Sequence, residues 1–380
     1  MFLHTLFSFL PFMVTLFWTM VIVLDNLHGW KKGFMPRLLL SSSVSTVFFL
    51  GEAFNFLVPD SGTDIVEMVV GICRLSIYPL FFMFIKKITT AKDTDFYDIL
   101  LLLPSFAMLV CAVVFKMTGS VHTGLFCWVN PVYLLVMVYL SFKSSICIIR
   151  YDRQIRNLYS NTVSKTFGKM LLIMYLMLFS SILSIFKSFI GRDFFYGNNK
   201  LSVPSLLIIS IIEFVFFYEG LKIDFSAEDV ASDQLDVNQI LQFWKRRSFF
   251  IQKNKKEEDV VQTADYSELL KGLDTLMKKK RMYRNPELKI TDVVDVLGSN
   301  RTYVSNAINH GLGMSFSDYI NRLRVEEAMA KLAVMAEGTS IRQVAEEVGF
   351  NNDATFYRHF RKITGMTPAD WMNRNKSTNQ

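Results

Sequence analysis

The sequence contains few of the residues that metal sites and nucleophilic catalysis require. Only 4 of its 380 residues are cysteines and only 5 are histidines. The cysteines lie in or beside long apolar runs, and no Cys or His pair has the spacing of a zinc site. The histidines are scattered, and neither a Gly-rich nucleotide loop nor a Ser/His/Asp set is apparent. We therefore expect no metal, no cofactor and no enzymatic activity such as that of a membrane signalling kinase.

Polar residues are scarce in the first part of the chain. The whole sequence is 51% hydrophobic and 14% aromatic, which is too apolar for one soluble domain of this length. The excess precedes about residue 220 and forms runs close to the ~20 residues that cross a bilayer as a helix. We predict that residues 1–220 form a seven-helix transmembrane domain, with spans at residues 2–24, 38–58, 65–85, 99–117, 129–149, 170–190 and 203–217.

Lys and Arg occur in alternate loops between these runs. The first, third and fifth loops are rich in basic residues, the second and fourth contain none, and the sixth has only Arg192 and Lys200. Cytoplasmic loops of membrane proteins carry an excess of Lys and Arg. The alternation therefore predicts an outside amino terminus and a cytoplasmic region after the seventh span.

Net charge is weak evidence for nucleic-acid binding. Residues up to Gly220 include 17 Lys+Arg and 12 Asp+Glu, whereas those from Leu221 onward include 24 and 22. Most of the net charge of +7 thus reflects membrane orientation. From Asn285 onward there are 11 basic and 11 acidic residues, so non-specific electrostatic affinity for DNA should be modest. Tethering to the membrane or dimerisation then has to raise the effective concentration.

Residues 221–263 are polar and charged, with interspersed aromatics, and we predict a cytoplasmic linker. Within it, the stretch QILQFWKRRSFFIQKNKK at residues 239–256 places apolar residues beside a basic cluster. Such a stretch can form an amphipathic helix on anionic lipid. A solvated linker is the simpler interpretation, and we favour it.

A short helical unit occurs twice in the predicted second domain, residues 264–380. In each copy an apolar helix ends at a glycine, and a second helix and a second glycine turn follow. This arrangement is that of a helix-turn-helix motif, doubled. At an offset of 51 residues, Ile290, Val293, Val294, Leu297 and Gly298 correspond to Ile341, Val344, Ala345, Val348 and Gly349; at 52, Gly313, Met314, Asp318 and Tyr319 correspond to Gly365, Met366, Asp370 and Trp371.

One long spacing pattern resembles a known family. The pattern A-x-x-V-G-F-x-x-x-x-x-F-x-x-x-F-[RK]-[KR]-x-x-G-[MV]-T-P is met from Ala345 to Pro368, and it looks like the second half of an AraC/XylS-type DNA-binding domain. The stretch YINRLRVEEAMAKL at residues 319–332 resembles that family's linker helix. In the first copy Val304 and Ile308 replace the usual Leu and Phe, which keeps these positions apolar.

The resemblance implies contact with double-stranded DNA through both second helices, in successive major-groove faces. Helical periodicity independently places Phe356 and Phe360 on one inward face, and Val304 and Ile308 on another. The positions that this leaves outside are the predicted DNA-binding residues, namely Arg301, Thr302, Ser305, Asn306, Asn309, Asp353, Ala354, Tyr357, Arg358, Arg361 and Lys362.

The chemistry of these side chains suggests different roles. Amides and Arg suit bidentate contacts to adenine and guanine edges, whereas Arg361 and Lys362 suit phosphates. Arg358 is the strongest single candidate for a base contact. Asp353 repels phosphate, so it either caps its helix or accepts a hydrogen bond from cytosine. The repetition supports the two faces as a whole more than any one residue.

Three ionisable residues, Glu52, Arg74 and Glu213, lie well inside predicted spans, where charges are costly and often functional. We predict that Arg74 pairs with Glu213 or with Glu52. Such a pair either holds helices together or lines a sensing site, and the sequence favours neither.

Together these features favour a membrane-anchored, one-component transcription regulator in the inner (cytoplasmic) membrane of a bacterium. The helical bundle is then its sensor or anchor. The expected partners are promoter DNA and the lipid bilayer, with a homodimer, RNA polymerase or a membrane partner protein as further candidates. The alternative is a transporter or channel-like membrane protein with a regulatory cytoplasmic tail. Charges inside the spans fit that alternative, but no inverted repeat is evident.

Overall fold

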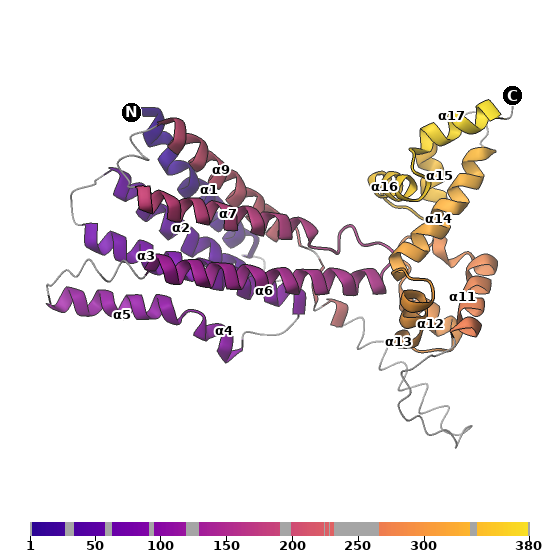
Figure 1. The fold of residues 1–380 in the computed structure, drawn as a ribbon, viewed down its shortest axis with the longest axis horizontal. Helices are drawn as coiled ribbons and strands as arrows, with labels where there is room; N and C mark the ends of the chain where they lie inside the picture. Colours follow the sequence, from indigo (N-terminus) through magenta and orange to yellow (C-terminus); the bar gives the residue numbers. More distant parts are fainter. Residues whose placement is uncertain are drawn as a thin grey trace, which may run out of the picture. The chain divides into compact units, whose positions relative to one another are not determined.

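The computed structural model describes residues 2–26, 34–57, 63–90, 95–118, 129–190, 199–223, 225–227, 229–231, 266–334 and 340–378. In these residues the regular elements are helices, as the sequence predicts, and the only extended pairing is one isolated β-bridge. The chain divides into two compact units. The first comprises Met1–Tyr151 and Phe167–Ala231, and the second comprises Asp152–Thr166 and Ser232–Gln380 (Figure 1). Most of the predicted linker lies outside the described residues.

The first unit is built from long apolar helices. Each of the predicted runs overlaps at least one of them, and four segments are long and apolar enough to cross a membrane in the described part of the chain: Phe7–Asp25, Met68–Thr90, Pro131–Leu158 and Val203–Leu221. Crossing by the other runs stays a prediction. The helices are α1 (Phe2–Asn26), α2 (Met35–Leu57), α3 (Thr63–Thr90), α4 (Phe96–Leu100), α5 (Leu103–Thr118), α6 (Val129–Leu158), α7 (Gly168–Ile190) and α9 (Asn199–Leu221).

The predicted span at residues 99–117 does not form one continuous helix. Its first residues belong to the short helix α4, where the Asp95 N–H donates to the Asp98 carboxylate at 2.9 Å. The chain then turns, and α5 begins with Pro104 in its first turn. Proline has no backbone N–H to donate to a preceding turn, so a helix that contains it there starts anew. The helix over residues 99–117 is therefore interrupted between Leu100 and Leu103, and the bounds of a membrane span there stay a prediction.

Side chains of α1, α2 and α9 pack together inside the first unit. Trp18 of α1 lies against Phe214 and Tyr218 of α9, with ring centroids 5.1 and 6.3 Å apart. The hydroxyl oxygens of Thr19 and Thr46 are 3.1 Å apart, which joins α1 to α2. Hydroxyl side chains of this kind connect helices in apolar surroundings.

The ionisable residues predicted inside spans occupy different environments. Arg74 Nη2 lies 4.0 Å from Glu52 Oε1, and its guanidinium lies over the rings of Phe48 and Tyr133 at 5.9 and 5.6 Å. Glu213 is buried, and its Oε2 atom has no hydrogen-bond partner among the described residues. Of the two predicted pairings of Arg74, the structure thus contains the one with Glu52. A role in sensing stays a prediction.

The second unit consists of shorter helices around two small cores. Figure 1 shows α14 extending from the group α11–α13 to the group α15–α17, and α14 contributes side chains to both cores. The first core includes Leu273, Met277, Val293, Val304, Ile308, Phe316 and Ile320, and the second includes Val325, Ala328, Val344, Val348, Phe356 and Phe360. The elements are α11 (Ser267–Lys280), η2 (Met282–Arg284), α12 (Ile290–Leu297), α13 (Arg301–Asn306), η3 (Ala307–Gly311), α14 (Phe316–Ala333), α15 (Ile341–Glu347), α16 (Asp353–Thr364) and α17 (Pro368–Thr378).

The glycines that the repeat makes equivalent adopt the same unusual backbone conformation. Gly298 and Gly349 follow α12 and α15 with φ of 63° and 101°, and Gly313 and Gly365 have φ of 66° and 79°. Residues with a side chain rarely adopt such angles. The two helix pairs, α12–α13 and α15–α16, therefore turn at matching positions.

The first turn and the inward face of α12 are set by its own residues. The helix begins at Ile290, where the Asp292 carboxylate accepts a hydrogen bond from the Lys289 N–H at 2.9 Å and closes the first turn. Val296 is 45% exposed. Val293 and Val294 already fill the inward face of this short helix.

Candidate nucleic-acid interface

Helix α16 carries the predicted contact residues of the second copy. Asn352 caps its first turn by accepting a hydrogen bond from the Thr355 N–H at 3.1 Å. Phe356 and Phe360 are fully buried, as predicted. Because they fix the inward face, the positions beside them face outward. The capping role considered for Asp353 belongs to Asn352, and Asp353 Oδ2 lies 3.9 Å from Arg342 Nε.

Helix α13 and the turn that follows it carry the predicted contact residues of the first copy. Asn300 caps it by accepting from the Tyr303 N–H at 2.7 Å. After Asn306 the chain continues as one turn of π-helix, Ala307–Gly311, which the sequence did not indicate. Asn309 Nδ2 donates to Ser305 Oγ at 3.2 Å. Two predicted contact residues are therefore hydrogen-bonded to each other.

None of the predicted contact residues belongs to either core. Thr302, Asp353, Ala354, Tyr357, Arg358, Arg361 and Lys362 are exposed, and Arg301, Ser305, Asn306 and Asn309 are half-buried. The structure thus leaves both sets accessible at the surface of the unit. Their contact with DNA stays a prediction.

Lys362 has a carboxylate partner that the sequence did not indicate. Its Nζ atom lies 2.7 Å from Asp318 Oδ1. Burial alone raises the pKa of Asp318, but hydrogen bonds from Lys362 and Ser315 outweigh it and hold the pKa below its ordinary value. Asp318 therefore stays ionised and competes with any phosphate for Lys362.

Removing this competitor should strengthen the ionic part of DNA binding. In the Asp318→Asn variant, Lys362 is released for a phosphate, so log Kd should depend on log salt concentration with a slope steeper by about 1. Binding of the full chain to duplex DNA across a salt series measures this slope. Asp370→Asn is the matched control, since Asp370 is the repeat equivalent of Asp318 and its carboxylate binds Thr367 instead of a lysine. A slope equal to that of the control would contradict the assignment of Lys362 to phosphate.

His359 lies on the inner side of α16, with its ring centroid 6.3 Å from that of Phe350. Burial, reinforced by the positive charge of Arg358, lowers the pKa of His359 to about 4. The imidazole is therefore neutral at neutral pH and adds no charge to the outward face of α16.

Comparison with known families identifies this part of the chain. Residues 293–374 match the family described as a helix-turn-helix domain. The match begins inside α12 and includes the rest of the first helix pair, the whole second pair and most of α17. The C-terminal domain is an AraC-type helix-turn-helix domain. It retains the apolar spacing and the glycine turns that carry the sequence resemblance.

Several curated transcriptional regulators are similar to part of this chain. The chain is 30% identical over 115 residues to the uncharacterised transcriptional regulatory protein YesN of Bacillus subtilis, covering 29% of this chain and 31% of YesN. It is 29% identical over 91 residues to the uncharacterised HTH-type transcriptional regulator YtdP of the same organism, covering 24% of this chain and 12% of YtdP. An uncharacterised HTH-type transcriptional regulator of Staphylococcus aureus is 25% identical over 115 residues, covering 30% of this chain and 13% of that protein. The chain therefore spans less than a third of the length of each of these relatives.

Sequence reasoning missed the residue at the centre of the AraC-type domain. Arg324 of α14 is 2% exposed and lies between the two cores. A signal was available, because Arg324 falls four residues from both Ile320 and Ala328, on the inward stripe of the helix. A charge at such a position indicates a buried hydrogen-bonding network rather than a solvated surface.

Proposed function

We propose that this chain is a membrane-anchored transcription regulator that binds specific DNA through two helix-turn-helix units. The observation that carries the proposal is the doubled arrangement of α12–α13 and α15–α16, each with a buried inner face and an accessible outer face. The family match and the regulator relatives support DNA binding as the activity. The helices of the first unit serve as anchor or sensor.

The chemistry of the outer faces supports base reading. Arg358 is exposed on α16, where an arginine can bind the O6 and N7 atoms of guanine. Asn306 is half-buried at the end of α13, and an amide suits the N6 and N7 atoms of adenine. The backbone N–H groups at the beginnings of both helices can donate hydrogen bonds to phosphate oxygens. In an AraC-type domain these two helices are the natural candidates for adjacent stretches of major groove.

The surface of the first unit supports the membrane anchor. Leu135, Phe142 and Phe179 are 71, 66 and 61% exposed on long helices. Large apolar side chains exposed to this degree are unfavourable in water and expected in contact with lipid tails. We expect the full chain to remain in the membrane fraction after an alkaline wash that releases peripheral proteins. Its appearance in the wash would contradict the anchor and leave the DNA-binding role untouched.

Replacing Arg358 with alanine tests specific reading by α16. We expect the full chain, reconstituted in lipid nanodiscs, to select duplexes of defined sequence from a random pool. The Arg358→Ala variant should bind the selected duplex less tightly by about 1–3 kcal/mol and tolerate changes at one base pair. Arg322→Ala is the control, because Arg322 is exposed on α14 and pairs with Glu326. Failure of the wild-type chain to select any sequence would refute the proposed function.

A further inference from the structure

A segment distant in sequence forms part of the second unit. Residues 159–166, the docked loop, connect the end of α6 to the start of α7. Tyr159 forms an antiparallel bridge with Lys289, and the Ser160 N–H donates to the Leu288 carbonyl at 3.0 Å. The loop thus lies along the chain that enters α12, and Leu158 just before it packs against the first core.

Ser160 has all of its polar groups satisfied by the AraC-type domain. Its carbonyl accepts from Ser317 Oγ at 3.0 Å and from Asn321 Nδ2 at 3.3 Å. Its hydroxyl donates to the Pro286 carbonyl at 3.3 Å and accepts from Arg324 Nη2 at 3.3 Å. Ser160 is 2% exposed. Contacts this complete are characteristic of a specific site for this residue.

The groups that receive Ser160 are themselves buried on one face of α14. Ser317, Asn321 and Arg324 are 3, 2 and 2% exposed. Buried polar groups are unfavourable without hydrogen-bond partners, and the loop supplies several of those partners. The face therefore has the composition of an interaction surface for a polar segment rather than of a core.

Arg324 connects this surface to both halves of the domain. Its guanidinium donates to the Tyr283 carbonyl at 2.6 Å and to the Asn285 carbonyl at 2.7 Å. The same group lies 5.6 Å from the centroid of the Phe350 ring. Tyr283 belongs to the first core and Phe350 to the second. Through Arg324, the loop is thus connected to the place where the two helix pairs meet.

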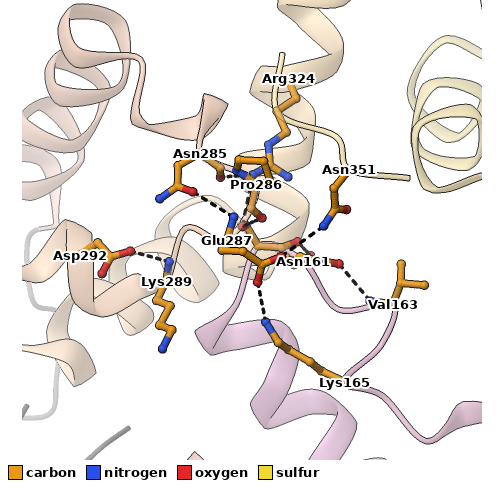
Figure 2. A network of polar contacts seen from close by, with 12 residues as sticks. Asn161, Val163, Lys165, Asn285, Pro286, Glu287, Lys289, Asp292, Arg324 and Asn351 are labelled. Atoms are coloured by element: carbon orange, nitrogen blue, oxygen red, sulfur yellow. Dashed lines mark hydrogen bonds and ion pairs between the residues drawn. The ribbon is translucent and has the colours of Figure 1, made fainter. Parts of the chain in front are cut away.

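Glu287 makes a second junction at the edge of the loop. Its carboxylate accepts from Asn161 Nδ2 at 2.9 Å and from Lys165 Nζ at 3.0 Å. It also accepts from Asn351 Nδ2 at 3.2 Å, just before α16 begins. Figure 2 shows the loop residues and Asn351 converging on Glu287 from different segments. The loop, the first helix pair and the second helix pair therefore share one carboxylate.

We propose that residues 286–289 with Ser317, Asn321 and Arg324 form a docking site for the loop 159–166 of this same chain, and that docking fixes the two helix pairs relative to each other for DNA binding. The second part rests on the proposed function. None of the predicted contact residues of α13 and α16 is hydrogen-bonded to the loop in the contacts described above, so docking leaves the outer faces open. The loop therefore acts on geometry and not by blocking DNA.

Because of its position in the chain, the loop can transmit a change in α6 and α7 to the docking site. The loop is joined covalently to α6 on one side and to α7 on the other. A change in these helices that withdraws the loop would remove partners from Arg324 and Glu287 together. Loosening of the junction should then lower DNA affinity, which provides a route for a signal that does not pass through the linker at residues 221–263.

Disulfide trapping tests the docking itself, without DNA. We would introduce Tyr159→Cys and Lys289→Cys into the full chain, with the four native cysteines replaced by serine. Cross-strand neighbours of this kind lie close enough for a disulfide. In native membranes under mild oxidant, the bond should form much faster than in the control with Val163→Cys and Lys289→Cys, since Figure 2 places Val163 away from Lys289. Equal rates for the two pairs would overturn the docking.

DNA binding tests the consequence of docking. Ser160→Trp cannot fit the buried position, and it should weaken binding of the full chain in nanodiscs to its selected duplex by about tenfold, as for a typical coupling between sites. Val163→Trp places the same side chain at an exposed loop position and should leave affinity unchanged. Lys165→Glu should weaken binding, and adding Glu287→Lys should restore part of it.

The outcomes separate the two proposals. Equal affinity of the Ser160→Trp and Val163→Trp chains, or no recovery on charge exchange, would overturn the effect of docking on DNA binding. A wild-type chain that selects no duplex but forms the 159–289 disulfide rapidly would refute the proposed function while supporting the docked loop. Rapid disulfide formation with selective loss of affinity in Ser160→Trp supports both.

Discussion

Replacing Gly349 with alanine is expected to destabilise the AraC-type domain by about 3 kcal/mol or more. Gly349 has φ of 101°, which strains any residue with a side chain. A Cβ atom there would also lie 2.5 Å from the carbonyl oxygen of Arg284. That backbone cannot shift freely, because Arg324 donates to the neighbouring carbonyls of Tyr283 and Asn285. Strain and collision therefore act together.

The repeat supplies the matched control for this variant. Gly298 is equivalent to Gly349 and has φ of 63°, but a Cβ atom there would meet no other atom within 4 Å. Gly298→Ala should therefore cost only the conformational strain, about 1–2 kcal/mol. The stability of both variants is measured by heating the full chain in nanodiscs and detecting unfolding of the AraC-type domain by its cleavage with a protease. Equal losses would show that the contact with Arg284 contributes nothing.

Replacing Arg324 with leucine is expected to cost about 3 kcal/mol and to abolish tight DNA binding. The substitution removes the donor from the carbonyls of Tyr283 and Asn285, and from Ser160 Oγ. Burial lowers the pKa of Arg324 to about 10, so the guanidinium is still charged at neutral pH. Its loss leaves several acceptors buried without partners, each of which carries a desolvation cost.

Arg322→Leu is the control for Arg324→Leu. Arg322 lies two residues earlier on α14, and its side chain is 56% exposed in an ion pair with Glu326. Exposed pairs of this type contribute about 0.5 kcal/mol. Unfolding and duplex binding of the two variants should therefore differ sharply. A loss of stability in Arg322→Leu as large as that in Arg324→Leu would mean that leucine on α14 is harmful for another reason.

Sequence alone could predict the features that depend on local spacing. Burial of Phe356 and Phe360 follows from their separation of four residues, and the left-handed turns follow from glycines at repeated positions. The family assignment of the C-terminal domain followed from the same fixed pattern. Such features depend only on neighbouring residues of one or two helices, so they can be predicted directly from the sequence.

Features that depend on distant parts of the chain could not be predicted in this way. The hydrogen bond between Ser160 and Arg324 joins residues 164 positions apart, and nothing around Ser160 distinguishes it from an ordinary loop serine. The ion pair of Lys362 with Asp318 joins separate helices. The π-turn after α13 and the break before α5 depend on neighbouring residues only. Each shifts the course of a helix by one residue or one turn, and the spacing of apolar residues in the sequence is too coarse to predict such a shift.

Because α13 and α16 carry different side chains, the proposed regulator should bind its promoter in one defined orientation. Helix α13 offers Asn306 and the π-helical turn after it offers Asn309, whereas the regular helix α16 offers Arg358 to a base and Arg361 to a phosphate. Amides favour adenine and arginines favour guanine. One protein chain bound through both helix pairs should therefore recognise a non-palindromic sequence in one orientation only. Inverting that sequence in front of a gene should therefore abolish regulation even though every base pair is retained.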